Sequence, residues 1–132
     1  MMNKLVLEWS DIEQLVEVLD EKVLGTKIRY IHGIERGGLI PAIMLSHRLN
    51  IPYVSHPELF NREEVLIVDD IADSGITISR WDKYTTAVLH YKPHTSICEP
   101  TLYVTSHTTD DWIVYPWEHP QAETIQDYKL DK

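Results

Sequence analysis

The sequence predicts an α/β fold in which a mainly parallel, twisted sheet is flanked by helices. Apolar segments of strand length alternate with segments of helical periodicity, which is the pattern of strands connected by helices. The segment Val65–Val68 is apolar throughout and mostly β-branched, as expected for a strand that is covered on both faces. With 132 residues, the chain is expected to form a single domain, residues 1–132, around one core.

Composition and charge limit the classes of function. The chain is 43% hydrophobic and 25% charged, which is ordinary for a globular protein, and its net charge of −9 counts against non-specific binding of nucleic acid. No apolar run has the length of a membrane span, and the N-terminus lacks the layout of a signal peptide. The single cysteine, Cys98, is typical of a protein in the reducing cytoplasm. A polyphosphate ligand of so acidic a protein is expected to need a divalent cation.

The first half of the chain contains an amphipathic helix followed by strand, helix and strand. Ser10 and Glu13 form a capping-box pattern at the start of the first helix, and Gly25 ends that helix. Its apolar residues fall on one face, namely Ile12, Leu15, Val16, Leu19 and Val23. The next elements are a strand, an apolar helix and a short edge strand, expected at Lys27–Ile34, Leu39–Leu49 and Ile51–Val54.

The second half contains the central strand and several shorter elements. A polar connection, Ser55–Glu64, leads into this strand. A short helix and three further strands follow, expected at Ile76–Trp81, Thr85–Tyr91, Leu102–Val104 and Trp112–Val114. The tail after Glu118 is polar and is expected to be partly mobile.

Small and acidic residues gather in two loops that each follow a predicted strand. Four of the five glycines lie there, namely Gly33, Gly37, Gly38 and Gly75. Asp69 and Asp70 end the central strand, and the backbone N–H groups of the loop after them favour an anion such as phosphate. A solvated turn with an aspartate cap would explain Asp73 or Ser74 alone. It would not explain two adjacent acids at the end of an apolar strand.

The stretch Val-Asp-Asp-Ile-Ala-Asp-Ser-Gly-Ile-Thr, residues 68–77, resembles the phosphoribosyl-diphosphate (PRPP) loop of the type I phosphoribosyltransferases. The resemblance implies that Asp69 and Asp70 bind the ribose hydroxyls, partly through Mg²⁺, and are the metal residues of the site. It implies that Asp73 exchanges a proton with the base. The 5′-phosphate would lie in the following loop, formed by Ala72, Asp73, Ser74, Gly75, Ile76 and Thr77.

Two further motifs resemble the same family. Glu35-Arg36-Gly37-Gly38 is similar to its pyrophosphate-binding loop, which implies that Arg36, Gly37 and Gly38 bind pyrophosphate; in the family this loop often carries a non-proline cis peptide. Tyr91-Lys92-Pro93 and the segment from Asp111 to Glu118 resemble the base-recognition elements of the xanthine–guanine and hypoxanthine branch. They imply a small C-terminal base-binding subregion, in which Lys92 approaches the purine 6-oxygen, Trp112 stacks on the ring and Ile113 faces ring position 2. Trp117 is expected to serve packing.

The resemblance implies a Mg²⁺-dependent transferase of purine salvage that converts PRPP and a purine base, most simply a 6-oxopurine, into a nucleoside monophosphate and pyrophosphate. It also implies a homodimer or homotetramer. Two features depart from the family pattern: the Ser55–Glu64 connection is shorter than the usual closing loop, and Glu35 adds a negative charge beside the proposed diphosphate site. Two alternatives stay open, a non-catalytic PRPP- or nucleotide-binding regulatory module of the same fold and a transferase for another base.

Overall fold

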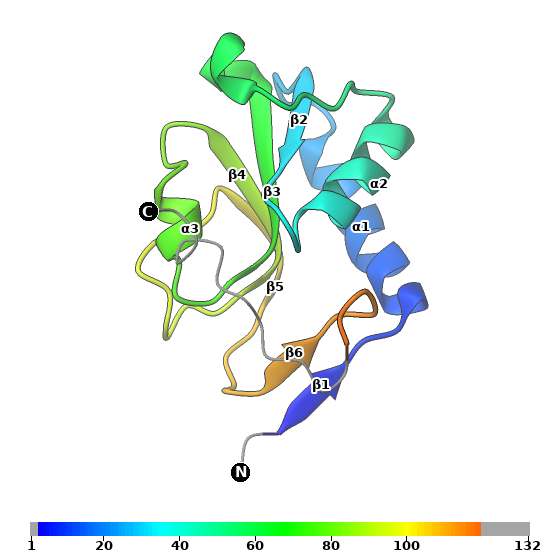
Figure 1. Ribbon diagram of the computed structural model, residues 1–132, viewed down its shortest axis with the longest axis vertical. Coiled ribbons are helices and arrows are strands. Elements are labelled where there is room, and N and C mark those ends of the chain that lie inside the picture. The colour runs from blue at the N-terminus through cyan, green and yellow to red at the C-terminus, as the bar shows by residue number, and fades with distance from the viewer. Residues whose placement is uncertain (1–2, 120–132) are drawn as a thin grey trace.

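A four-stranded parallel sheet forms the centre of the molecule in the computed structural model, which describes residues 3–119 (Figure 1). The strand order is β2-β3-β4-β5, and every neighbouring pair is parallel. The strands span Tyr30–Gly33, Val65–Ala72, Thr85–Tyr91 and Leu102–Ser106. The predicted fold class, a mainly parallel sheet flanked by helices, is confirmed.

Two helices cover one face of this sheet, and a third lies on the other face (Figure 1). Helix α1 spans Trp9–Val23, helix α2 spans Leu39–Leu49 and the short helix α3 spans Ile76–Ser79. The predicted apolar stripe of α1 is confirmed, because Ile12, Val16, Leu19 and Val23 are buried against the sheet. On the α3 side, Ile78 packs in a second cluster of apolar residues that includes Ile67 and Val88.

Strand β3 is the central element, and it is longer than the sequence suggested. Val65, Leu66, Ile67 and Val68 are fully buried, as predicted for a strand that is covered on both faces. Pairing with β4 continues beyond them through Ile71↔His90 and Ala72↔Tyr91. The prediction that Asp69 and Asp70 end the strand is therefore wrong, because both acids lie within it.

Three local predictions need correction. Helix α1 begins at Trp9 with Glu8 as its N-cap, and the Glu8 N–H donates to the Asp11 carboxylate at 2.8 Å. A capping box of Glu8 and Asp11, two residues earlier, therefore replaces the predicted box of Ser10 and Glu13. The strand predicted at Lys27–Ile34 is confined to β2. The edge strand predicted at Ile51–Val54 is reduced to one bridge, Ile31↔Tyr53.

The connection from α2 to β3 lies at the end of the sheet where the strands begin (Figure 1). It contains two 3₁₀ turns, η1 (Pro57–Leu59) and η2 (Arg62–Glu64). The Arg29 N–H, just before β2, donates to the Glu64 oxygen at 2.8 Å. The Ser55–Glu64 connection is therefore anchored at the opposite end of the sheet from the carboxyl ends of the strands.

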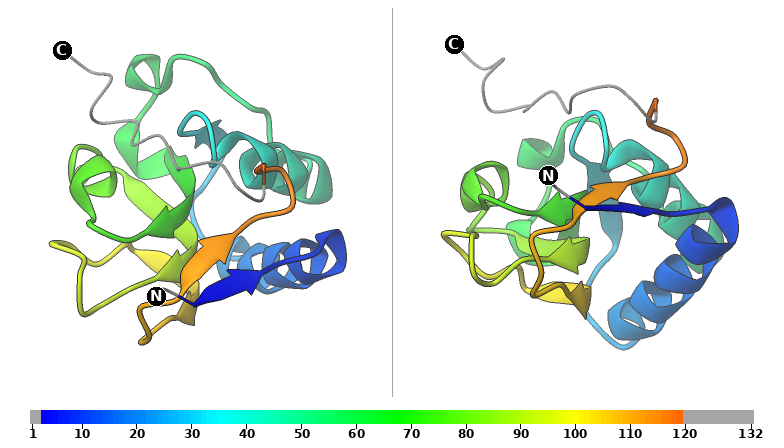
Figure 2. Two further views of the ribbon diagram at one scale, coloured as in Figure 1. Left: turned by 60° about the horizontal axis from the view of Figure 1, so that its bottom comes forward. Right: turned by 90° about the horizontal axis from the view of Figure 1, so that it is seen from below.

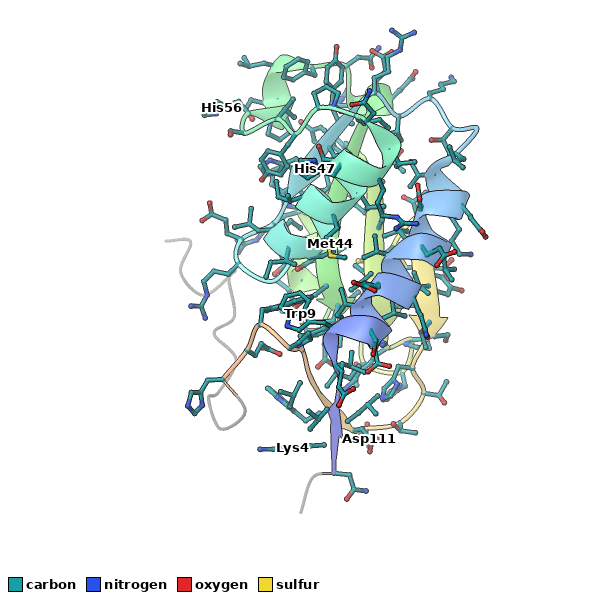
Figure 3. The ribbon with its side chains drawn as sticks, turned by 90° about the vertical axis from the view of Figure 1, so that its right-hand side faces the viewer. Lys4, Trp9, Met44, His47, His56 and Asp111 are labelled. Atoms are coloured by element: carbon teal, nitrogen blue, oxygen red, sulfur yellow. The ribbon has the colours of Figure 1, made fainter. Side chains whose placement is uncertain are left out.

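A second, two-stranded sheet joins the beginning of the chain to its C-terminal part (Figure 2). Strand β1 (Lys4–Val6), which was not predicted, pairs in parallel with the predicted strand β6 (Trp112–Val114). Trp9, at the start of α1, lies beside the segment after β6 (Figure 3), and its ring centroid is 5.9 Å from that of Trp117. The N-terminal segment therefore supports the segment from Trp112 onward.

The predicted polar tail after Glu118 lies, from residue 120 on, outside the described residues. Within residues 3–119, none of the helices combines the length and the apolar character needed to cross a bilayer.

Gly38 tests how closely the start of helix α2 packs against strand β3. A Cβ atom at this position would overlap the backbone oxygen of Val68 and lie 2.7 Å from that of Ile34. Because backbone atoms of the sheet cannot move aside easily, we expect Gly38→Ala to lower the free energy of unfolding by about 3 kcal/mol or more. Gly25→Ala is the control: the space around Gly25 is open and only its positive φ of 83° opposes the change, at a cost of roughly 1–2 kcal/mol. Equal losses in urea unfolding would contradict the tight packing at Gly38.

Candidate active site

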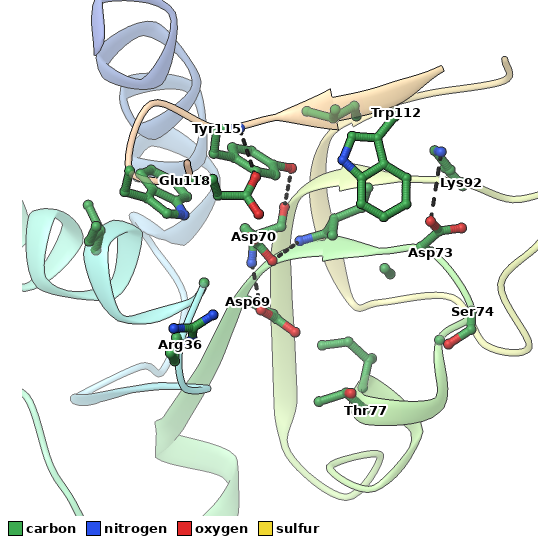
Figure 4. Close-up of a pocket in the computed structure, with 18 of the residues that line it drawn as sticks. Arg36, Asp69, Asp70, Asp73, Ser74, Thr77, Lys92, Trp112, Tyr115 and Glu118 are labelled. Atoms are coloured by element: carbon green, nitrogen blue, oxygen red, sulfur yellow. Dashed lines mark hydrogen bonds and ion pairs between the residues drawn. The ribbon is translucent and has the colours of Figure 1, made fainter. Parts of the chain in front are cut away.

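A pocket of about 430 Å³ opens at the carboxyl ends of β3 and β4 (Figure 4). Its position agrees with the general rule that open α/β sheets bind ligands beyond the carboxyl ends of their strands. It brings together most of the residues singled out from the sequence, namely Arg36, Gly37, Asp69, Asp70, Ala72, Asp73, Ser74, Gly75, Thr77, Lys92, Trp112 and Ile113. Gly38 and Ile76 do not line it.

The acid pair on β3 forms the centre of the pocket. Asp69 is only 6% exposed, and its Oδ1 accepts a hydrogen bond from the Asp70 N–H at 2.9 Å. Asp70 Oδ1 in turn accepts from the Ile71 N–H at 2.8 Å. Each carboxylate is therefore oriented by the backbone of the next residue. Gly37 lies so close that a Cβ atom there would overlap the Asp70 carboxylate, so a side chain at this position would have to displace that carboxylate.

Negative charge accumulates around Asp70. Burial, aided by the charge of Glu118, raises the pKa of Asp70 to about 6, while hydrogen bonds with Asp69 and the backbone limit the shift. Glu118 follows β6 and accepts a hydrogen bond from the Tyr115 N–H at 2.9 Å. Carboxylates held this way favour a bound cation, since a cation removes the mutual repulsion.

The donor set suits a hard divalent cation that is shared with a ligand. Asp69 and Asp70 offer carboxylate oxygens, which Mg²⁺ prefers. Within residues 3–119, no group of three or more histidine, cysteine, aspartate or glutamate residues is arranged to hold a metal ion. A cation at the acid pair would therefore complete its coordination with water and with ligand oxygens, as Mg²⁺ commonly does with phosphates.

The Arg36 loop joins β2 to α2 beside the acid pair. Its Glu35–Arg36 peptide bond is cis, as is often the case in the family loop that it resembles. The Ile34 N–H donates to the Val68 oxygen at 2.9 Å, and the Gly38 N–H donates to the Ile34 oxygen at 2.8 Å. These bonds attach the loop to β3. Arg36 and Lys92 lie on opposite sides of the acid pair in Figure 4, so positive side chains flank the carboxylates.

The loop after β3 is held by the segment that follows β4. Gly75 has a φ of 78°, and a Cβ atom there would overlap the Ser96 hydroxyl. The Ile97 N–H donates to the Ser74 oxygen at 2.8 Å, and Cys98 Sγ lies 3.3 Å from the Gly75 oxygen. Ser74 and Thr77 line the pocket, so hydroxyl-bearing residues of this loop lie where an anion could bind.

Asp73 is oriented by two neighbours. The Thr95 hydroxyl lies 2.9 Å from Asp73 Oδ1 and 2.8 Å from the Asp73 backbone oxygen. Lys92 Nζ lies 3.8 Å from Asp73 Oδ2 and donates to the Asp111 oxygen at 2.9 Å. Lys92 is only 5% exposed, so its ammonium depends on these partners. Sequence reasoning missed Thr95, because nothing in the sequence links it to an aspartate 22 positions earlier.

The segment from Trp112 to Glu118 forms the remaining wall. Trp112 and Ile113 line the pocket, together with two residues that sequence reasoning did not single out, Tyr115 and Glu118. Trp117 packs as predicted, stacked on Tyr115 with ring centroids 4.9 Å apart, but it also lines the pocket. The only available signal for Glu118 was its position within the segment that resembles the family's base-recognition element.

Comparison with known proteins identifies similar chains. No protein-family model matches. The chain is 30% identical over 116 residues to a xanthine-guanine phosphoribosyltransferase of Cereibacter sphaeroides, an alignment that covers 68% of this chain and 69% of that protein. The structure is similar to a purine phosphoribosyltransferase of Pyrococcus horikoshii, with 31% identity, a TM-score of 0.76 and coverage of 94% of this chain and all of the other.

A second similar structure is that of a Neisseria gonorrhoeae protein with bound ppGpp. It is 28% identical, has a TM-score of 0.72, and the match covers 92% of each chain.

The raised pKa of Asp70 predicts that this residue destabilises the unliganded fold. For a carboxyl whose folded pKa lies above its unfolded value, stability is lost as pH rises between those values, here from about 4 to about 6. In the absence of metal and phosphate, Asp70→Asn is expected to raise the free energy of unfolding at pH 7.5 by about 1–2 kcal/mol, after allowance for solvent screening. This increase in the free energy of unfolding should become smaller as the pH is lowered toward 4.

Urea unfolding from pH 4 to pH 8 measures this difference. Asp82→Asn is the control, since it removes the same charge from an exposed position. A gain that is equal for both variants, or independent of pH, would show that Asp70 is not the cause.

Proposed function

The chain belongs to the xanthine-guanine phosphoribosyltransferase family, and we propose that it transfers the phosphoribosyl group of PRPP to a purine base, giving a nucleoside monophosphate and pyrophosphate. The observation that carries this proposal is that four features line one pocket. They are the acid pair Asp69–Asp70, the loop after β3, the Arg36 loop, and the side chains of Lys92 and Trp112. Each part suits a different portion of the two substrates.

PRPP would occupy the part of the pocket between β3 and the Arg36 loop. The loop from Ala72 to Thr77 would bind the 5′-phosphate through its backbone N–H groups and hydroxyls. Asp69 and Asp70 would bind the ribose hydroxyls. Arg36, with Gly37, would bind the diphosphate, for which a planar guanidinium is well suited. The predicted third residue, Gly38, does not line the pocket, and its N–H donates to the Ile34 oxygen, so Gly38 would shape the loop instead.

Asp69 and Asp70 would also hold Mg²⁺ together with oxygens of the diphosphate. When bound, the ion supplies positive charge that offsets the repulsion between the acids and the diphosphate and stabilises the leaving pyrophosphate. The acidity of the site makes this contribution necessary, because the chain carries a net charge of −9 and Glu118 adds a further carboxylate near Asp70.

The reaction requires alignment more than covalent help from the protein. A ring nitrogen of the purine attacks C1′ of the ribose, the bond from C1′ to the pyrophosphate oxygen breaks, and the base loses a proton. Asp73 would accept that proton, since Thr95 and Lys92 orient its carboxylate at the edge of the pocket. Trp112 would hold the base by stacking, a contact worth roughly 1–3 kcal/mol.

The preferred base would be a 6-oxopurine. Lys92 Nζ lies at the pocket with the Asp111 oxygen and Asp73 as its partners. An ammonium has donors and no acceptor, so it pairs with the 6-oxygen of hypoxanthine, guanine or xanthine but not with the 6-amino group of adenine. The backbone of Ile113 would face ring position 2.

A non-catalytic nucleotide-binding protein of the same fold is the second candidate. The Ser55–Glu64 connection is anchored at the far end of the sheet and does not line the pocket, so within residues 3–119 it provides no loop that covers the diphosphate. The similar protein with bound ppGpp is also consistent with nucleotide binding. Such a protein would bind PRPP or a nucleotide without forming pyrophosphate.

The remaining features follow from the same proposal. We expect a single domain that acts in the cytoplasm as a homodimer or homotetramer.

Incubation with PRPP, Mg²⁺ and each of hypoxanthine, guanine, xanthine and adenine tests the activity and the base together. We expect pyrophosphate and nucleotide to form, with kcat/KM at least about tenfold higher for the best 6-oxopurine than for adenine, because adenine leaves the Lys92 ammonium mispaired. Lys92→Met should reduce this preference, whereas the exposed Lys83→Met should not. Binding of PRPP without turnover of any base would favour the second candidate, and an unchanged preference in Lys92→Met would exclude Lys92 from base recognition.

Removal of divalent cations tests the role of the acid pair. We expect excess chelator to abolish turnover and to weaken PRPP binding by at least about tenfold, since a tenfold change corresponds to only about 1.4 kcal/mol of lost attraction. Mg²⁺ or Mn²⁺ should restore both, as measured by pyrophosphate release and by calorimetry. Full activity in chelator would show that Asp69 and Asp70 serve another purpose.

A further inference from the structure

A buried chain of hydrogen bonds runs along one wall of the pocket and uses side chains to which the proposed reaction assigns no role. His90 Nδ1 lies 2.8 Å from the Tyr115 hydroxyl, and that hydroxyl lies 3.2 Å from the backbone oxygen of Asp70. His90 is 4% exposed and Tyr115 is 2% exposed. His90 lies in β4, Tyr115 in the segment after β6, and Asp70 in β3. These hydrogen bonds therefore connect three separate parts of the fold.

The direction of each bond follows from the chemistry of its groups. A backbone oxygen only accepts, so the Tyr115 hydroxyl donates its proton to Asp70 (Figure 4). The phenol oxygen then accepts from His90, whose Nδ1 therefore carries a proton. Burial lowers the pKa of His90 to about 4, with His107 and Lys92 adding to the effect, so the ring is neutral near pH 7. His90 thus donates to Tyr115, and Tyr115 donates to Asp70.

We propose that His90 and Tyr115 are positioning residues that hold the purine-binding segment Trp112–Glu118 in register with the Asp69–Asp70 pair. The inference rests on the proposed phosphoribosyl transfer, in which the segment binds the base and the acid pair binds the ribose. Attack on C1′ requires these two substrates to be aligned closely, and a misplacement of about 1 Å can reduce a rate about a hundredfold.

The contacts of Tyr115 and Asp70 fit alignment better than packing alone. The hydroxyl of Tyr115 donates to β3, while its backbone N–H donates to the Glu118 carboxylate at 2.9 Å, so one residue orients both its own segment and the acidic strand. On β3, the carboxylates of Asp69 and Asp70 accept hydrogen bonds from the N–H groups of Asp70 and Ile71. The Tyr115 hydroxyl adds a hydrogen bond to the backbone oxygen of Asp70, in the peptide group that contains the Ile71 N–H.

The buried polar groups also carry a cost that packing would not require. A phenylalanine and a leucine would fill nearly the same space as Tyr115 and His90 without burying a hydroxyl and an imidazole. Removing one partner of such a bond strands the other, whereas removing both can be nearly neutral for stability. This asymmetry allows stability and alignment to be measured separately.

The test compares Tyr115→Phe, the double variant Tyr115→Phe/His90→Leu and the wild type. In Tyr115→Phe we expect kcat to fall about tenfold or more, while the Kd for PRPP and the KM for the purine change less than about threefold, because alignment is lost and the individual contacts are kept. Its Tm should fall, since His90 Nδ1–H is left without an acceptor. In the double variant, Tm should recover in part while kcat stays as low as in Tyr115→Phe.

His90→Asn and His90→Leu form a matched pair of nearly equal shape. Asparagine retains an N–H donor near the position of Nδ1, so His90→Asn should keep a higher kcat than His90→Leu. Wild-type kcat in Tyr115→Phe, or a kcat that recovers together with Tm in the double variant, would overturn the positioning role. Failure of the wild type to form nucleotide from any base would instead refute the proposed function, and the positioning role with it.

Discussion

The site depends on the way in which β3 is held along its whole length. Its first half is fully buried between two layers, and its second half continues to pair with β4 up to Ala72↔Tyr91. A strand that is apolar on both faces cannot slip or rotate without exposing buried surface. Asp69 and Asp70 are consequently carried to the pocket by a rigid element, and the loops around them are attached to it by backbone hydrogen bonds such as Ile34 N–H to the Val68 oxygen.

This rigidity keeps like charges together. Asp69 is nearly buried, the pKa of Asp70 is raised to about 6 by burial and by Glu118, and Lys92 is enclosed with the Asp111 oxygen and Asp73 as partners. Such an arrangement adds little to the stability of the folded chain, because the ionised side chains are desolvated and only some of them form ion pairs. This is typical of a preorganised binding site. Its polar groups are already oriented in the unliganded protein, so they bind the ligand without rearrangement.

The sequence predicted the parts of this structure that depend on local patterns. The apolar run Val65–Val68 and the stripe on α1 follow from periodicity, and the alternation of such strands and helices predicted the fold class. The glycines around Arg36 mark a close backbone approach. What was missed depends on contacts between distant residues. Strand β1 is three exposed residues with no alternation, and only its partner β6 defines it. Thr95 and the His90–Tyr115 pair likewise acquire their meaning from partners 22 and 25 positions away.

The pairing of β1 with β6 has a consequence for biosynthesis. Among the strands of residues 3–119, β1 comes first in the sequence and its partner β6 comes last, so β1 is synthesised well before β6. The acidic strand and the loops around it can therefore assemble on a nascent chain whose base-side wall does not yet exist. Until residues 112–114 emerge, β1 lacks the strand with which it pairs in the folded structure. The two-stranded sheet that supports the segment from Trp112 onward can therefore form only late in synthesis.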